Sequence, residues 1–239
     1  MSFSDYNKYK DTGFLWLGKV PGHWQLRPLG SCFRERREKV NDTDYPPLSV
    51  TKQGIVPQLE HAAKTDDNDN RKCVISGDFV INSRSDRNGS SGMACEDGSV
   101  SLINTVLQPR EEVDIHFVHH LLRSVNFQEE YYRFGKGIVA DLWSTNYSAM
   151  KRICLAVPPL DEQKEIASFL DAETLKIDDL VSEQRRLIEL LKEKRQAVIS
   201  HAVTKGLNPN APMKPSGIQW LGDVPQHWQV VRLGRLCND

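Results

Sequence analysis

The sequence predicts an α+β fold in which a globular domain with a mixed sheet is followed by one long helix. Short strand-like segments separated by turns fill the first two thirds of the chain. No glycine or proline then occurs between Asp161 and Gly206, and a segment near the start of the chain returns near its end. These observations predict three parts: a globular domain over 1–157, a long helix over 158–205, and a linker with the start of a second repeat over 206–239.

The repeated segment is Trp16–Gly30, which matches Trp220–Gly234 at a constant offset of 204 residues. Ten of its fifteen positions are identical, including two tryptophans, a proline and a histidine. A period of this length is too long for a solenoid and indicates duplication of a whole domain. In the first copy, Gly18 and Pro21 indicate a turn, and 24–29 reads as a short strand at a sheet edge, where its proline is tolerated.

The aromatic and imidazole side chains of the repeat have structural interpretations. Trp16 and Trp24 are predicted to pack on the core. A histidine in a turn most often bonds to backbone, so we expect His23 and His227 to cap their turns rather than to bind a ligand or act as switches.

The rest of the globular domain mixes strand signals with one helix signal. Apolar and β-branched residues predict strands within 47–50, 73–81 and 99–107. Apolar residues at helical spacing predict a helix over 115–125. The domain is therefore expected to be mixed α+β.

A single helix is predicted to follow the two prolines at 158–159. Asp161 is the expected cap at its start. The helix would extend over about 45 residues, or roughly 65 Å at 1.5 Å per residue. Gly206, Pro209 and Pro212 would end it and form the linker to the second copy of the repeat.

Apolar residues recur along this helix in alternating steps of four and three, which is typical of a coiled-coil seam. Its first half carries seven acids against two lysines, and its second half six bases against three acids. This sorting favours an antiparallel partner, either the equivalent helix of a second unit or that of a second copy of the chain, although a solvated charged face is the alternative. The positions predicted to pair are Ile166, Leu170, Ile177, Leu180, Gln184, Leu187, Leu191 and Val198.

Composition limits the class of protein further. The net charge is −1, so any basic surface must be local. The five cysteines are odd in number and form no Cys-x-x-Cys pair, which argues against disulfides and a cysteine zinc site. There is no apolar run long enough for a membrane span and no signal-peptide pattern at the start, so we expect a cytoplasmic protein that does not engage a membrane.

Motifs for catalysis or metal binding are weak. His116, His119 and His120 could share one helix face, but no completing ligand is evident. Asp66–Asn70 begins like a calcium loop and lacks the required glycine and glutamate. The residues at 162–164 resemble part of a nuclease carboxylate–lysine set, but an ordinary first helical turn is the better interpretation. We expect no catalytic residue, metal or cofactor in this chain.

Several polar loops carry side chains suited to reading double-stranded DNA. Arginine can form two hydrogen bonds to guanine and asparagine to adenine, while lysine, hydroxyl and backbone amide groups bind phosphates. Each loop alone could simply be solvated. The candidate DNA-binding residues are Arg34, Arg36, Arg37, Lys52, Gln53, Asn82, Ser83, Arg84, Arg87, Asn88, Ser90, Arg133 and Lys136.

Taken together, these features resemble the specificity subunits of type I restriction–modification systems. The segments that carry the resemblance are Trp16–Trp24 with its later copy, Gly77–Ile81 and Pro158–Asp171, and the last is the most specific. The resemblance covers essentially the whole chain. It implies a target recognition domain followed by a long helix, in a subunit that is not itself an enzyme.

The resemblance also implies partners. Methyltransferase subunits would carry S-adenosylmethionine and methylate adenine, and restriction subunits would use ATP and Mg²⁺ to translocate and cut DNA. A full subunit of the family has two recognition domains, whereas this chain has one. It could therefore be a half-subunit that dimerises through its helix, a product of a frameshifted gene, or a fragment.

Two other functions remain open on the sequence alone. One is a coiled-coil scaffold whose head domain binds something other than DNA. The other is a metal-dependent enzyme that uses His116 and His119. The DNA sequence recognised, and which loop residues contact bases rather than phosphates, cannot be read from the sequence.

Overall fold

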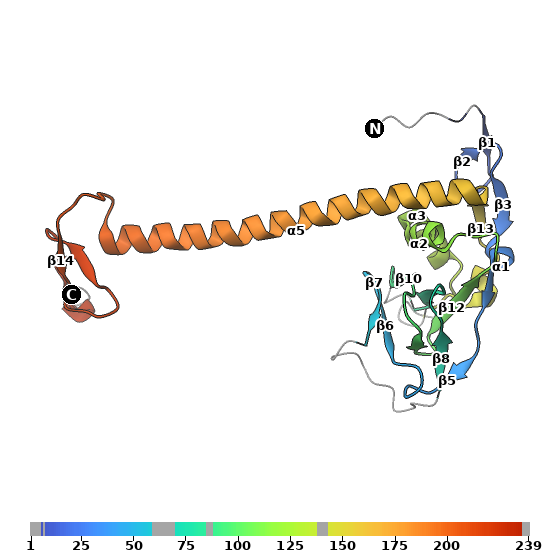
Figure 1. Ribbon diagram of the computed structural model, residues 1–239, viewed down its shortest axis with the longest axis horizontal. Helices are drawn as coiled ribbons and strands as arrows, with labels where there is room; N and C mark the ends of the chain where they lie inside the picture. The colour runs from blue at the N-terminus through green and yellow to red at the C-terminus, as the bar shows by residue number, and fades with distance from the viewer. Residues whose placement is uncertain (1–5, 7, 59–69, 85–87, 138–142, 236–239) are drawn as a thin grey trace. The chain divides into compact units, whose positions relative to one another are not determined.

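The computed structural model describes residues 6, 8–58, 70–84, 88–137 and 143–235. The chain divides into two compact units, Met1–Ala172 and Glu173–Asp239. The fold is α+β, with several small sheets and one long uninterrupted helix, as the sequence predicts (Figure 1).

The first unit contains thirteen strands in the described part of the chain: β1 Tyr9–Asp11, β2 Lys19–Pro21, β3 Gln25–Pro28, β4 Phe33–Glu35, β5 Lys39–Val40, β6 Leu48–Thr51, β7 Gly54–Pro57, β8 Arg71–Val74, β9 Phe79–Asn82, β10 Ser91–Met93, β11 Gly98–Val100, β12 Asn104–Pro109 and β13 Cys154–Val157. Its helices are α1 Leu29–Cys32, α2 Ile115–Arg123, α3 Val125–Arg133, α4 Tyr147–Met150 and the start of α5 Leu160–Lys205. The second unit contains the rest of α5, β14 Met213–Pro215, β15 Asp223–Pro225 and the 3₁₀ turn η3 Leu233–Arg235.

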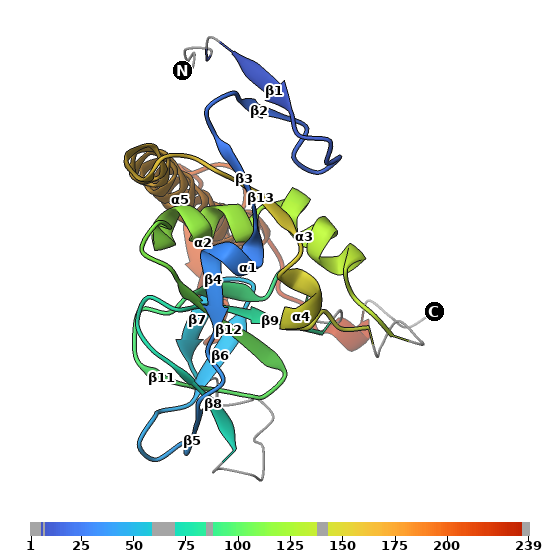
Figure 2. The same ribbon diagram turned by 90° about the vertical axis from the view of Figure 1, so that its right-hand side faces the viewer.

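The central sheet has the antiparallel order β10-β9-β12-β4 and is covered on both faces. Alternate residues of a strand point to opposite faces, so Phe79 and Ile81 enter one apolar cluster with α2 and α3, while Val80 enters a second cluster with β6, β8 and β11. On β12, Leu107 enters the first of these clusters and Val106 the second. In Figure 2, α2 and α3 lie above this sheet and β8 below it. Burial on both faces explains why the central strand β9 shows no alternation of apolar and polar residues, since all four of its residues are buried.

Two predicted segments are interrupted. The strand expected within 73–81 is two strands, β8 and β9, because a turn intervenes at 75–78. Gly77 has a φ of 90°, and the Asp78 carboxylate accepts the Ile75 N–H at 2.9 Å. The strand expected within 99–107 is likewise divided between β11 and β12.

The helix predicted over 115–125 ends at Arg123, and a second helix that the sequence analysis missed follows at once. Asp114 caps α2 by accepting the Phe117 N–H at 2.9 Å, and Ser124 caps α3 by accepting the Phe127 N–H at 3.3 Å. A serine in this place is a capping signal that could have revealed the boundary.

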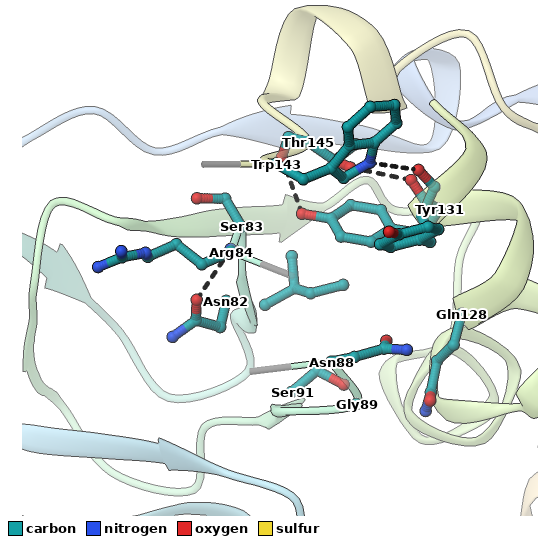
Figure 3. A pocket seen from close by; sticks show the side chains of 12 residues that line it. Asn82, Ser83, Arg84, Asn88, Gly89, Ser91, Gln128, Tyr131, Trp143 and Thr145 are labelled. Carbon is teal, nitrogen blue, oxygen red and sulfur yellow. Dashed lines mark hydrogen bonds between the residues drawn. The ribbon is translucent and has the colours of Figure 1, made fainter. Parts of the chain in front are cut away.

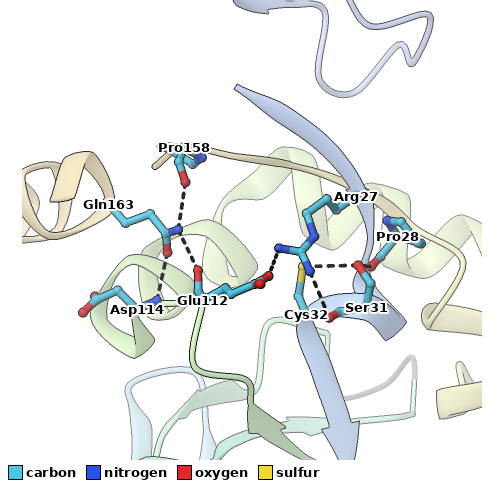
Figure 4. A network of polar contacts seen from close by, with 8 residues as sticks. All are labelled: Arg27, Pro28, Ser31, Cys32, Glu112, Asp114, Pro158 and Gln163. Carbon is cyan, nitrogen blue, oxygen red and sulfur yellow. Dashed lines mark hydrogen bonds and ion pairs between the residues drawn. The ribbon is translucent and has the colours of Figure 1, made fainter. Parts of the chain in front are cut away.

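The start of α5 is held by a buried amide side chain, Gln163, which is 0 % exposed. Its Nε2 donates to the carbonyls of Pro158 at 2.9 Å and Glu112 at 3.1 Å, and its Oε1 accepts the Asp114 N–H at 2.8 Å (Figure 4). The helix begins at Leu160, so the expected cap, Asp161, instead lies in the first turn. There its charge still suits the positive end of the helix dipole.

Beside Gln163, the Glu162 carboxylate contacts three polar groups from the first 24 residues of the chain. The hydroxyl of Tyr6 donates at 2.5 Å and Nε1 of Trp24 at 2.9 Å, while Nε2 of His23 lies 2.7 Å from the carboxylate. Burial alone would raise the pKa of Glu162, but the three hydrogen bonds outweigh it and hold the pKa below its ordinary value. The hydrogen bond from the Tyr6 hydroxyl to Glu162 raises the pKa of Tyr6 to about 12.

These contacts correct two expectations and confirm a third. His23 bonds a carboxylate on α5 rather than turn backbone. Trp24 is half-buried and contacts Glu162, so it is not a core residue. Trp16 does pack on the core, with its ring centroid 5.9 Å from that of Phe127.

In the second unit, the repeat extends further than the sequence match. Strands β14 and β15 pair with the register Met213↔Pro225, which is the β1–β2 register Tyr9↔Pro21 displaced by 204 residues. The predicted strand does not recur after Trp228, because β3 forms by pairing with β13 and the described residues of the second unit contain no counterpart of β13. The part of the structure that repeats is therefore the hairpin, β1–β2 in the first unit and β14–β15 in the second, and its two strands pair in the same register in both copies.

His119 joins α2 to β10. Its Nδ1 accepts the Met93 N–H at 3.2 Å, and its Nε2 lies 2.8 Å from a guanidinium nitrogen of Arg123. Burial, followed by the positive charge of Arg123, lowers the pKa of His119 to about 4. The imidazole is therefore neutral in the folded protein at neutral pH.

We predict that Glu162→Ala lowers the free energy of unfolding by about 2 kcal/mol, because three donors lose a charged acceptor. A carboxyl with a lowered pKa contributes stability that is present above its ordinary pKa, near 4.5, and is lost as pH falls through the folded-state value. The difference from wild type, measured by urea unfolding, should therefore shrink in acid. Glu165→Ala, an exposed change on the same helix, is the control, and equal losses for the two variants would contradict the prediction.

We predict that His119 makes the first unit less stable as pH falls from 6.5 towards 4, by on the order of 1–2 kcal/mol, since the imidazole is only partly buried and solvent screens its interactions. The unfolded chain takes up a proton near pH 6.5, whereas the folded imidazole resists protonation until about pH 4. His119→Gln should show a shallower pH dependence in thermal unfolding, and His201→Gln, at an exposed position on α5, should match wild type. If the stability of His119→Gln depended on pH as steeply as that of the wild type, groups other than His119 would be responsible for the pH dependence.

Candidate nucleic-acid interface

One surface of the first unit brings together polar groups from four separate segments. The turn between β6 and β7 exposes Lys52 and Gln53, and its Lys52 carbonyl accepts a hydrogen bond from Arg123 at the end of α2 at 2.6 Å. Gln128 of α3 donates to the Arg123 carbonyl at 2.8 Å. The turn, α2 and α3 therefore form one continuous edge of the unit.

The segment that follows β9 continues this edge. Ser144 forms isolated bridges with both Arg84 and Lys136, which brings the exposed side chains of two distant segments to one place. Asn82 is buried, and its Oδ1 accepts the Arg84 N–H at 3.0 Å. We call this surface the loop face. It comprises Lys52, Gln53, Arg84, Asn88, Arg123, Gln128, Tyr132, Lys136 and Trp143.

Aromatic rings form part of the loop face. Tyr132 and Trp143 stack with centroids 5.6 Å apart, and Nε1 of Trp143 donates to the Tyr132 carbonyl at 2.9 Å (Figure 3). Gly135 allows this approach, because a Cβ there would lie 2.1 Å from Nε1 of Trp143. Sequence reasoning missed both rings and Gln128; the cluster of aromatic residues around the basic 133–137 loop was the available signal.

The arginines predicted in the 34–37 segment lie elsewhere. They are on or beside β4, at the edge of the central sheet opposite β10. Arg36 forms two hydrogen bonds to the Asp78 carboxylate, at 2.6 and 3.1 Å, and these bonds raise its pKa above the ordinary value. Arg37 pairs with Glu35 at 2.6 Å, whereas Arg34 is exposed in an open groove that also contains Arg110.

The remaining candidates have varied surroundings. Ser90 is buried at the start of the β9–β10 pairing, and Ser83 donates to the Ile103 carbonyl. Arg133 pairs with Glu130 at 2.6 Å and remains largely exposed. Arg87 lies outside the described residues. The structure thus gathers Lys52, Gln53, Arg84, Asn88 and Lys136 on the loop face and gives Arg36, Asn82 and Ser90 structural roles.

The histidines of α2 are engaged by other groups. Nε2 of His120 lies 2.7 Å from the Asp171 carboxylate of α5, and Nδ1 of His116 lies 3.6 Å from it. In the described part of the chain, no cluster of three or more metal-ligating side chains is present. Most of the calcium-like segment at 66–70 lies outside that part. Among the helices described, none is both long and apolar enough to cross a bilayer.

Comparison with known proteins gives a consistent relationship. No protein-family model matches the chain. The type I restriction enzyme MjaX specificity subunit of Methanocaldococcus jannaschii is 23% identical over 95% of this chain and 56% of its own length. The MjaVIII specificity subunit of the same organism is 23% identical over 96% of this chain and 53% of its own length.

The fold agrees with these sequence matches. The crystal structure of the HsdS subunit from Thermoanaerobacter tengcongensis superposes with a TM-score of 0.56 at 19% identity, covering 86% of this chain and 54% of that one. The chain spans about half the length of the curated relatives it matches. Through its sequence along nearly its whole length and through its fold, the chain is related to the specificity subunits of type I restriction enzymes.

Proposed function

We propose that this chain reads a specific DNA sequence for a type I restriction–modification complex in the cytoplasm and is not itself an enzyme. The observation that carries this proposal is the match to specificity subunits over 95% of the chain. Methyltransferase and restriction subunits would supply S-adenosylmethionine, ATP and Mg²⁺, methylate adenine and cleave the DNA.

The loop face is the proposed DNA-contacting surface. Lys52, Arg84 and Lys136 are exposed cations on one edge, a suitable arrangement for neighbouring phosphates. Gln53 and Asn88 are exposed amides on the same loop face, and amides can pair with adenine in the major groove. Arg34, Arg37 and Arg133 remain candidate phosphate contacts outside this surface. Arg123 supports the face through the Lys52 carbonyl, so its own contact with DNA is not required.

The long helix is proposed to pair with an antiparallel copy of itself. Beyond the first unit, the predicted seam is exposed: Ile177 is 58 %, Leu180 61 % and Leu187 47 % exposed. Apolar side chains repeated along one helical seam favour burial against a partner helix. An antiparallel copy would also place the acidic half of each helix beside the basic half of the other. Such a dimer would combine two recognition domains and favour a symmetric DNA target.

A direct test of the whole proposal is methylome mapping of the source cell with and without the gene. We expect one adenine-methylated sequence motif to disappear when the gene is deleted and to return on complementation. If no motif changes and the chain purifies with no methyltransferase, the coiled-coil scaffold with a head that does not bind DNA becomes the better interpretation.

We predict that Arg84→Ala with Lys136→Ala weakens DNA binding by tenfold or more at low salt and reduces the slope of log affinity against log salt by about 2, because two phosphate contacts are lost. The measurement is a fluorescence anisotropy titration at several salt concentrations. Arg232→Ala, an exposed arginine in the second unit, should leave both quantities unchanged. Wild-type affinity in the double variant would exclude the loop face as the DNA-contacting surface.

We predict that Leu180→Glu with Leu187→Glu converts a dimer into a monomer, because a charge in an apolar seam cannot be buried without a partner. Sedimentation at micromolar concentration measures the change. Leu190 lies off the predicted seam and has a similar exposure, 52 %, so the control variant Leu190→Glu should leave the dimer intact. A wild-type protein that sediments as a monomer at this concentration would exclude helix pairing.

A further inference from the structure

A small cavity opens beside the stacked rings of the loop face. Its volume is about 20 Å³, which is room for one methyl group or one water molecule. Its walls include Ile81, Ser91, Tyr131, Tyr132 and Trp143 (Figure 3). Ile81 and Tyr131 belong to the apolar core, so the cavity ends against a rigid, mainly apolar surface.

One polar atom in this wall has no hydrogen-bond partner within the described part of the chain. Ser91 is 1 % exposed, and among the described residues its hydroxyl finds no hydrogen bond. A buried hydroxyl without a partner costs free energy, so such groups often mark the place of a ligand or an ordered water. The cavity therefore combines space for a methyl group with a hydroxyl that can donate.

The position of the cavity connects it to DNA. Arg84 and Asn88 line it, and Lys136 lies beside it through the Ser144 bridges. A duplex held by the cationic side chains of Arg84 and Lys136 would present base edges to the loop face. Only one of the four bases carries a methyl group next to a hydrogen-bond acceptor in the major groove: thymine, with its 5-methyl and O4. Cytosine offers an amino donor at this place and no methyl group.

We propose that this cavity reads a thymine, with the 5-methyl group filling the apolar space and O4 accepting from the Ser91 hydroxyl. The proposal rests on the DNA-reading function given above and adds one specified base to it. Tyr132 and Trp143 form the apolar wall, and Gly135 is required for that wall because any side chain there would collide with Trp143. The cavity would thus distinguish thymine from the other bases by shape as well as by hydrogen bonding.

The test replaces thymine by uracil, one position at a time, in a duplex that carries the sequence found by methylome mapping. The full chain, assembled with its methyltransferase, is titrated with each duplex. Burial of one methyl group predicts about fourfold weaker binding at one thymine position. Ser91→Thr places a methyl group of its own at the cavity, so this variant should bind the thymine and uracil duplexes equally.

Ser76→Thr, the same change on the turn before β9, is the matched control and should retain the fourfold difference. Trp143→Ala provides a second variant, since removal of one wall should also abolish the difference. The proposal is overturned if specific binding persists and no uracil substitution weakens it, or if the fourfold difference survives in both variants, as expected of a cavity that holds only water. Absence of any sequence-specific binding would instead refute the proposed function, and this inference with it.

Discussion

The hydrogen bonds of Gln163 determine how the recognition domain continues into the long helix. One buried amide satisfies two carbonyls and one N–H from segments that are far apart in the sequence. Those groups lie before α2 and before α5, so the side chain ties the two helices together at their starts. An unsatisfied amide at 0 % exposure would be costly, which makes this arrangement strongly preferred over alternatives.

The charged contacts around this amide extend the same connection outwards. Glu162 joins the N-terminal repeat to the first turn of α5, and Asp171 joins α2 to the fourth turn. Residues of the first and fourth turns of one helix thus contact three separate parts of the domain. Since the loop face is built on α2, α3 and the strands beneath them, its geometry depends on how firmly these turns are held.

Features that depend on local sequence were predicted well, and features that depend on distant contacts were not. The long helix follows from the absence of glycine and proline, and the repeat follows from direct identity. The roles of His23 and Trp24 could not be predicted, because both depend on Glu162, which lies more than 130 residues away. The ion pair of Arg36 could not be predicted for the same reason: its partner Asp78 becomes a neighbour only through the sheet. The stack of Tyr132 on Trp143 likewise requires the 131–145 segment to fold back on itself.

The loop face is held together largely by bonds to backbone carbonyls. Arg123 binds the carbonyl of Lys52, Gln128 binds that of Arg123, and Trp143 binds that of Tyr132. Every amino acid supplies a carbonyl, so the side chains displayed at positions such as 52 and 53 can change without loss of the bonds that hold their segments. Evolution can therefore revise what this surface recognises while the scaffold beneath it stays the same.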